Sequence, residues 1–257
     1  MAKILFLGTR SGTEPLPGMH HASVAIESNG FYYWFDAGEC CSQTAAEMGV
    51  DLLKMKSVFI SHSHIDHMGG LLNLLWSVTK MISRGYGMPP EGRVSLFTPD
   101  MQSWEGLEVY HKSICGNNGW RFEMLANRTV DGLVYSDENI TVRAIHNLHI
   151  PSPAEGEYLS YSYIIEVAGK KIVYSGDVKE LTELCECIGE HCDVLICETG
   201  HHKVDDVLKL AQENSVRRLI FTHHGREIIN GREDAERRAA GSPCDAVLAY
   251  DKMVVEL

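Results

Sequence analysis

Several features are missing from this 257-residue sequence, and each absence narrows the possibilities. No apolar run approaches the roughly 20 residues that a membrane-spanning helix needs, so a membrane partner is not expected. The N-terminal apolar stretch at residues 4–7 is too short for a secretory signal, and a cytoplasmic location is the expectation. No low-complexity segment interrupts the chain, which favours a single domain over residues 1–257.

Positive charge is also scarce. The chain has 23 Lys and Arg against 35 Asp and Glu, a formal net charge of −12. Affinity for nucleic acid comes mainly from basic side chains that neutralise phosphates, so the composition disfavours extended nucleic acid as a partner. The densest basic positions are expected at solvated helix ends and turns; they are Arg217, Arg218, Arg232, Arg237 and Arg238. A homo-oligomer stays open, because nothing in the sequence decides it.

The eight cysteines are expected to be thiols, because no export signal points to an oxidising compartment. Four of them lie close together in the sequence, at Cys185, Cys187, Cys192 and Cys197, and could hold a structural zinc ion. Cys197 lies within an apolar run, however, where a small buried thiol packs well. Packing is therefore the preferred role for this cluster.

The most informative segment is residues 61–70, SHSHIDHMGG, which holds His62, His64, Asp66 and His67. An apolar run at 58–60 precedes it and a Leu-rich stretch follows it, so these ligands are expected on the turn between a strand and a helix. Imidazole and carboxylate groups suit Zn²⁺ and related ions, and the absence of cysteine favours an open catalytic site over a closed structural one. The alternative is a polar loop that happens to be rich in histidine.

The spacing within this segment supports two ions. His62 and His64 can project the same way while Asp66 and His67 point elsewhere, so one loop could serve two neighbouring sites. Two ions that lie close together can share a hydroxide and stabilise both oxygens of a displaced group. The segment therefore indicates a metal-dependent hydrolase.

Runs of β-branched and aromatic residues alternate along the chain with helical patterns. A tight turn at Ala168 and Gly169 joins two of the expected strands. The expected helices cover residues 42–48, 71–82, 102–114, 181–188 and 204–214. The expected strands cover residues 4–7, 23–26, 31–35, 58–60, 94–97, 141–145, 162–167, 171–174, 194–197, 219–222, 246–249 and 254–256.

The sequence contains a faint internal repeat. Residues 31–38 resemble residues 171–177, and residues 58–62 resemble residues 219–223. Each half thus sends strands that end in Asp or His toward a shared polar edge. This arrangement favours two similar halves packed face to face, with the chemistry at the seam between them.

Further ligand candidates follow three of the later strands. His146 and His149 follow the strand at 141–145, Asp177 follows the strand at 171–174, and a histidine pair follows the strand at 219–222. A catalytic zinc usually keeps three protein ligands and one open position. Two ions that share Asp177 could therefore be completed by one histidine from 146 or 149 and one from 223 or 224.

The ordered set of His-x-His-x-Asp-His, a later His, an Asp in Ser-Gly-Asp and a final Thr-His resembles the metallo-β-lactamase-fold hydrolases over nearly the whole chain. This resemblance implies an α/β fold, an αββα sandwich of two mixed sheets with helices on both outer faces and a dinuclear site at one edge. It also implies the ligand sets: His62, His64 and His149 for the first ion, Asp66, His67 and His223 for the second, and Asp177 as the bridge.

The same resemblance chooses within the histidine pairs. His149 precedes a Pro-containing turn, as the family's ligand does, and is preferred to His146. His223 directly follows a threonine and is preferred to His224. The other member of each pair would orient a ligand or lie at the surface. Asp36 matches an aspartate that braces the ligand loop, and the alternative is an ordinary turn aspartate.

Residues 7–9, 174–177 and 198–201 look like the phosphodiesterase branch that includes ribonuclease Z. In that branch a histidine oriented by a glutamate is placed to protonate the leaving oxygen, roles that His201 and Glu198 would fill. The alternative is that His201 and His202 simply begin a helix. Only 27 residues separate His149 from Asp177, which leaves little room for the arm that grips transfer RNA in ribonuclease Z.

The function expected from the sequence is hydrolysis of a small phosphodiester or nucleotide-type substrate through a metal-bridging hydroxide. Asp66 would orient this nucleophile and accept its proton, and His201 would act as the general acid. The cofactors would be two divalent ions, with Zn²⁺ preferred to Mn²⁺ or Fe. The alternatives are a thioester or lactone hydrolase of the same fold and a non-catalytic member that binds metal or another ligand.

Overall fold

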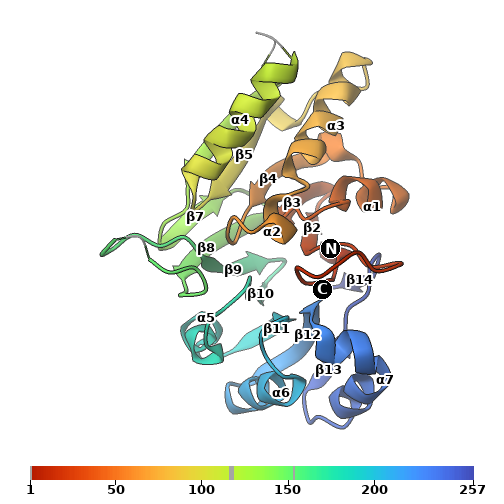
Figure 1. Cartoon of the computed structure of the whole chain (residues 1–257), viewed down its shortest axis with the longest axis vertical. Coiled ribbons are helices and arrows are strands. Elements are labelled where there is room, and N and C mark those ends of the chain that lie inside the picture. Colours follow the sequence, from red (N-terminus) through yellow and green to blue (C-terminus); the bar gives the residue numbers. More distant parts are fainter. Residues whose placement is uncertain (1, 116–118, 153) are drawn as a thin grey trace.

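The computed structural model describes residues 2–115, 119–152 and 154–257, which form two seven-stranded mixed β-sheets packed against each other (Figure 1). Helices α1, α3 and α4 cover the outer face of one sheet, and α5, α6 and α7 cover the outer face of the other. The αββα sandwich predicted from the sequence is therefore confirmed.

The first sheet has the strand order β14-β1-β2-β3-β4-β5-β6, in which β14 through β3 are antiparallel and β3 through β6 are parallel. Its strands are β1 (Ala2–Gly8), β2 (Ser23–Ser28), β3 (Phe31–Phe35), β4 (Met55–Phe59), β5 (Arg93–Thr98), β6 (Glu123–Arg128) and β14 (Val254–Glu256). The helices of this half are α1 (Cys41–Glu47), α2 (Ile65–Met68), α3 (Leu71–Ser83) and α4 (Met101–Cys115), with 3₁₀ turns at Leu52–Lys54 and Pro90–Gly92.

The second sheet repeats this plan, with antiparallel pairing from β7 through β10 and parallel pairing from β10 through β13. Its strands are β7 (Gly132–Ser136), β8 (Ile140–His146), β9 (Tyr161–Val167), β10 (Lys170–Tyr174), β11 (Cys192–Thr199), β12 (Val216–His224) and β13 (Asp245–Leu248). Its helices are α5 (Leu184–Ile188), preceded by a 3₁₀ turn at Leu181–Glu183, α6 (Val204–Glu213) and α7 (Arg226–Ala240).

Side chains alternate between the two faces of each strand and so form three buried layers, one between the sheets and one between each sheet and its helices. In β3 and β4, Phe35 and Phe59 point into the space between the sheets, while Trp34 and Val58 point toward the helices. Helix α3 packs against the outer face through apolar residues at helical spacing; they are Leu71, Leu74, Leu75 and Val78. These layers hold the strand ends rigidly, so side chains that follow the strands occupy fixed positions.

Every strand and helix expected from the sequence is present, with ends that differ by a few residues. Strands β6 and β7 and helix α7 were not predicted. The residues of β6 are half-buried or exposed and give little alternation, and α7 is strongly charged with a break at Gly231. Arg217 and Arg218 lie in strand β12 and Arg232 lies inside helix α7, which corrects the prediction of helix ends and turns for these three, whereas Arg237 and Arg238 do lie in the last turn of α7.

The two halves of the chain have corresponding strand orders, but the strands that correspond in the sheets are not all the ones that the sequence repeat paired. Strand β3 is followed in the sheet by parallel β4, just as β10 is followed by parallel β11. By topology, β4 therefore corresponds to β11. The sequence repeat instead matched residues 58–62, at the end of β4, to residues 219–223 in β12, which is one strand further along the sheet. The prediction that both halves direct strand ends to one polar edge is confirmed.

Within the three described ranges, no helix combines the length and the hydrophobicity that crossing a bilayer requires.

Candidate metal centre

Three histidines from two segments form the first cluster. His62 follows β4 and is fully buried, and its Nε2 lies 3.0 Å from Nδ1 of His64. His149, in the loop after β8, places its Nε2 3.3 Å from the same Nδ1 atom. A tetrahedral zinc with bonds of 2.0–2.1 Å sets its ligand atoms about 3.3 Å apart. Two of the three pairs of nitrogens have about this spacing, and one ligand nitrogen from each of the three histidines lies within 4.8 Å of the other two.

A second cluster lies beside the first. Asp66 and His67 are carried by the short helix α2, where the sequence predicted a plain turn. Nε2 of His223, at the end of β12, lies 3.1 Å from Nε2 of His67 and 3.0 Å from Oδ2 of Asp66. This set also has the spacing of a metal shell.

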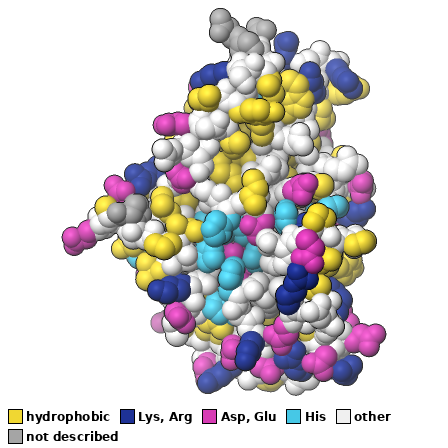
Figure 2. Space-filling model, in the orientation of Figure 1, with side chains coloured by type: hydrophobic (Ala, Val, Ile, Leu, Met, Phe, Trp, Pro, Cys, Tyr) yellow, Lys and Arg dark blue, Asp and Glu magenta, His cyan; other side chains and the backbone are white. Residues whose placement is uncertain are grey.

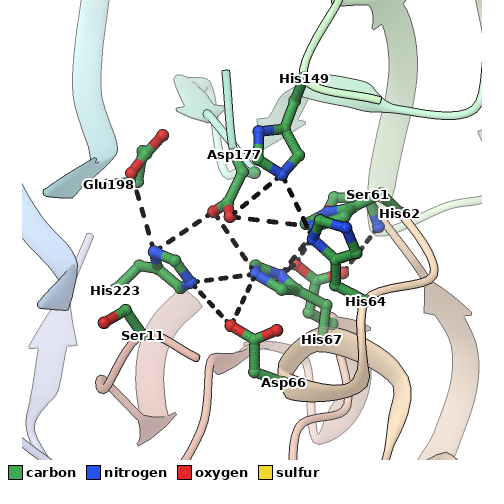
Figure 3. A network of polar contacts seen from close by, with 12 residues as sticks. Ser11, Ser61, His62, His64, Asp66, His67, His149, Asp177, Glu198 and His223 are labelled. Atoms are coloured by element: carbon green, nitrogen blue, oxygen red, sulfur yellow. Dashed lines mark hydrogen bonds and ion pairs between the residues drawn. The ribbon is translucent and has the colours of Figure 1, made fainter. Parts of the chain in front are cut away.

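Asp177 lies between the two clusters (Figure 3). Its Oδ2 faces the first cluster, 3.9 Å from Nε2 of His62 and 3.7 Å from Nε2 of His149. Its Oδ1 faces the second, 3.4 Å from Nε2 of His67 and 3.3 Å from Nδ1 of His223. Oδ1 is buried without a hydrogen bond, an arrangement that a cation would satisfy.

Gly176 allows this approach of Asp177. It has a positive φ of 56°, and a Cβ atom there would lie 2.7 Å from Cβ of Ser61. No other residue fits this position without displacing the ligand loop. The glycine of the Ser-Gly-Asp motif therefore has a steric reason.

Asp36 contacts the ligand loop directly. It is buried, adopts a left-handed φ of 58°, and accepts hydrogen bonds from the Ser61 backbone N–H (2.6 Å) and hydroxyl (2.8 Å). It also accepts from the Tyr174 hydroxyl and from Nδ1 of His67, each at 2.7 Å. The last bond places the His67 proton on Nδ1 and leaves Nε2 free to bind a metal.

The imidazoles of the two clusters fall into two groups, one with a lowered pKa and one with a raised pKa. Burial, aided by the neighbouring imidazoles, lowers the pKa of His62 well below its usual value. Burial also opposes charge on His67 and His223, but nearby carboxylates outweigh it, and Asp177 is the strongest of them in both cases. The pKa of His67 is thus raised well above its usual value and that of His223 to about 9.

The carboxylates show the reverse effect. Burial opposes the ionisation of Asp66 and Asp177, yet the imidazoles of His67 and His223 hold both pKa values below the usual range. The two groups are therefore ionised at neutral pH. Buried carboxylates that hold protonated imidazoles beside them suit a divalent cation, which can take the place of the histidine protons.

His201 and Glu198 stand beside the second cluster. Glu198 ends β11, is fully buried, and accepts hydrogen bonds from the backbone N–H of His201 (2.9 Å) and from its Nδ1 (3.0 Å). This hydrogen bond is the main cause of the raised pKa of His201. The His201 side chain is 46% exposed, and its Nδ1 lies 3.6 Å from Oδ2 of Asp177.

The helix-start alternative for the two adjacent histidines does not describe their contacts. Lys203 is the N-cap of α6, and the imidazole of His202 instead bonds the Val178 carbonyl at 3.0 Å. The glycine before His201 is closely confined, because a Cβ atom on Gly200 would lie 2.5 Å from Nδ1 of His223. This segment is therefore packed onto the candidate centre.

The rejected members of the two histidine pairs lie elsewhere. The His146 ring stacks on Tyr158 at 3.5 Å between centroids, and its Nδ1 contacts Oδ2 of Asp131 at 2.7 Å. His224 is buried and its Nε2 contacts the Ala249 carbonyl at 2.8 Å, and burial lowers its pKa to about 4.

The cysteine cluster does not form a metal site among the described residues. All eight cysteines are free, and none belongs to a group of potential ligands within reach of one ion. Burial raises the pKa of the Cys187 thiol to about 12 and that of Cys192 to about 11. These are neutral thiols that pack in the core, as the preferred interpretation expected.

A polar cavity of about 300 Å³ opens over the second cluster, and Figure 2 shows the histidines gathered on this face between the two halves. Part of its lining comes from Ser11, Gly12 and Thr13, which the sequence analysis did not identify. The buried Arg10 holds this loop through the carbonyls of Thr13 and Glu14. Only the preceding motif at residues 7–9 signalled that this region is functional.

A family model described as the beta-lactamase superfamily domain matches residues 34–224. The chain therefore belongs to this superfamily, and the resemblance drawn from its motifs is confirmed.

Individual relatives agree with this assignment. Ribonuclease Z of Methanosarcina mazei is 25% identical over 281 residues, which cover 87% of each chain. The solved structure of the short form of human tRNase Z has a TM-score of 0.71 at 19% identity and covers 99% of this chain and 98% of its own. A diphosphatase of the PhnP family has a TM-score of 0.72 at 18% identity and covers 100% and 98%. These structures share the fold.

Proposed function

We propose that the protein is a phosphodiesterase that uses two divalent metal ions, with Zn²⁺ as the preferred metal. The observation that carries this proposal is the pair of three-ligand clusters joined by the two oxygens of Asp177. The relatives named ribonuclease Z, tRNase Z and diphosphatase support phosphate esters as the substrate class.

In this proposal each cluster would hold one ion, and each oxygen of Asp177 would face one of them. His62, His64 and His149 would hold the first ion, and Asp66, His67 and His223 the second. Bound there, the ions would supply a water made acidic enough to attack at neutral pH and would neutralise charge on phosphoryl oxygens.

Asp66 and His201 would handle the protons. Asp66 is ionised and lines the polar cavity, so it orients the attacking water and accepts its proton. His201 also lines this cavity, and its bond to Glu198 uses Nδ1 and leaves Nε2 free. Its raised pKa favours the protonated imidazole, the form that donates a proton to the leaving oxygen as the general acid.

A small phosphodiester is a better substrate for this chain than transfer RNA. The net charge of −12 opposes the approach of a polyanion. The segment between His149 and Asp177, which leaves little room for the RNA-gripping arm, carries the exposed residues Glu155 and Glu157. These charges would repel a phosphate backbone.

The experiment is a comparison of substrates with metal-loaded protein, whose metal content is measured by elemental analysis. We expect hydrolysis of bis(p-nitrophenyl) phosphate, with little activity on thioesters, lactones or a transfer RNA precursor. Asp177→Ala should abolish turnover and lower the metal content, because this side chain contacts both clusters. Preference for a thioester or lactone would support the alternative hydrolase, and full activity of the Asp177 variant would overturn the ligand assignment.

A further inference from the structure

We propose that a second cavity beside His64 binds one ester arm of the substrate and selects an uncharged heteroaromatic ring that carries an exocyclic amino group, such as cytosine. This inference rests on the proposed function and specifies its substrate class. It depends on the position of the cavity, its apolar sides and the carboxylate that lines it.

The position connects the cavity to the chemistry. It has a volume of about 210 Å³ and is lined by Ser63, His64, Asp100, Ile150 and Leu159. His64 also lines the polar cavity of about 300 Å³ that contains Asp66, Asp177 and His201. A diester whose phosphorus lies in the polar cavity can therefore extend one arm past the His64 ring into the second cavity.

The apolar sides come from the two ends of the loop that follows His149. Ile150 and Leu159 are both half-buried, so they offer accessible apolar surface. The loop ends are held together because the Ile150 N–H donates to the Ser160 hydroxyl (3.1 Å), which itself donates to the Asn147 carbonyl (3.0 Å). A preformed apolar surface of this kind favours a flat ring over a hydrated polar group.

The polar group is the carboxylate of Asp100. It accepts hydrogen bonds from the Ser63 hydroxyl (3.2 Å), the Gln102 backbone N–H (3.0 Å) and the Ser103 hydroxyl. An ionised carboxylate has about four acceptor positions, so one remains for a ligand donor. No Lys or Arg is among the described residues that line either cavity. A donor on a neutral ring is therefore favoured, and a second phosphate is disfavoured.

The test uses two substrates whose rings differ in whether they offer Asp100 an exocyclic amino donor. These are the p-nitrophenyl esters of cytidine 5′-phosphate and uridine 5′-phosphate, because cytosine presents an amino donor where uracil presents a carbonyl acceptor. We expect kcat/KM to be at least about tenfold higher for the cytidine ester, which corresponds to about 1.4 kcal/mol. Methyl p-nitrophenyl phosphate has no ring and gives the baseline.

Two variants identify the groups responsible. Asp100→Asn keeps the size and the helix-capping ability of the side chain and adds a donor, so the cytidine preference should fall toward one. Leu159→Ala should lower kcat/KM about three- to tenfold for both nucleoside esters. The methyl baseline separates an effect on this cavity from an effect on the ligand loop, which Asp100 contacts through Ser63. Leu133→Ala is the matched control, because Leu133 is 57% exposed on β7 and does not line the cavity.

A cytidine to uridine ratio near one in the wild-type protein, or a ratio that Asp100→Asn leaves unchanged, would overturn the inference. Equal losses on all three substrates would show that the side chains are only structural. If none of the three esters is hydrolysed, the proposed function fails instead. Titration calorimetry with the methyl esters of cytidine and uridine 5′-phosphate then decides the inference, since binding needs no turnover.

Discussion

Replacing Asp36 with Asn tests how far the metal centre depends on the residue behind it. The carboxylate accepts four hydrogen bonds, three at Oδ2 and one at Oδ1. An asparagine has to turn its NH₂ group toward one of these sides. If it faces the single donor, the backbone N–H of Ser61 loses its partner, at a cost of about 1–3 kcal/mol. The bond from His67 also loses its charged acceptor and about half of its strength.

We therefore expect Asp36→Asn to lower the free energy of unfolding of the metal-free protein by about 1–3 kcal/mol. Loss of a group that orients a ligand typically weakens metal binding by about 10–100-fold, and the effect should fall on the ion held by His67. Competition with a chromophoric chelator measures the two affinities, and chemical denaturation measures the stability.

Asp137→Asn is the matched control. Asp137 is half-buried, whereas Asp36 is fully buried, and it likewise accepts several hydrogen bonds, from the hydroxyls of Tyr33 and Tyr135 and from Lys56, at the end of the sheets away from the centre. This variant should lose stability with both metal affinities unchanged. Unchanged metal affinity in Asp36→Asn, or an equal loss of affinity in Asp137→Asn, would refute the reasoning.

Three further predictions concern the centre. His201→Gln should lower kcat about 10²–10⁴-fold for a substrate with an alkyl leaving group, but far less for one that releases p-nitrophenolate, which needs no proton. An equal loss of kcat on both substrates would exclude the general-acid role. Gly200→Ala should weaken binding of the second ion, because the new Cβ atom would lie 2.5 Å from Nδ1 of His223. Gly231→Ala is the control and should leave binding unchanged, because open space surrounds that position. Competition with a chelator compares the metal affinities of the two variants. Metal binding at pH 7.5 should release at least one proton, because the pKa of His223 is raised to about 9 and an imidazole must be neutral to bind a metal. Calorimetry in buffers of different ionisation enthalpy measures this proton release. Binding heats that do not depend on the buffer would contradict the prediction.

The pH dependence of stability has a defined sign for the metal-free protein. His223 has a higher pKa in the folded chain than the usual 6.5, so its contribution to stability is complete below about pH 6.5 and is lost as the pH rises through about 9. Metal-loaded protein should lack this loss, because the bound nitrogen no longer carries a proton. Denaturation curves between pH 6.5 and 9.5 with and without metal would detect the difference.

The sequence by itself determined the parts of this protein that depend on local pattern. The dense set of His62, His64, Asp66 and His67 after an apolar run indicated a metal-binding turn, because few other roles gather such ligands in six residues. Strand and helix periods are likewise local, so most elements were found. Helix α7 was missed because its burial depends on partners in β12 and β13 rather than on its own weak apolar pattern.

The residues alone left neighbouring candidates open, the resemblance preferred His149 and His223, and the tertiary structure supplies the physical reason for that preference. His223 and His224 are consecutive at the end of β12, where the register with β11 shifts and His223 adopts a left-handed φ of 49°, and one imidazole reaches Asp66 while the other reaches the Ala249 carbonyl. The meeting of Asp36 with His67 likewise depends on how β3 and β4 pack in the sheet. Contacts between distant segments are fixed by packing, and no local pattern of residues encodes which way each side chain turns.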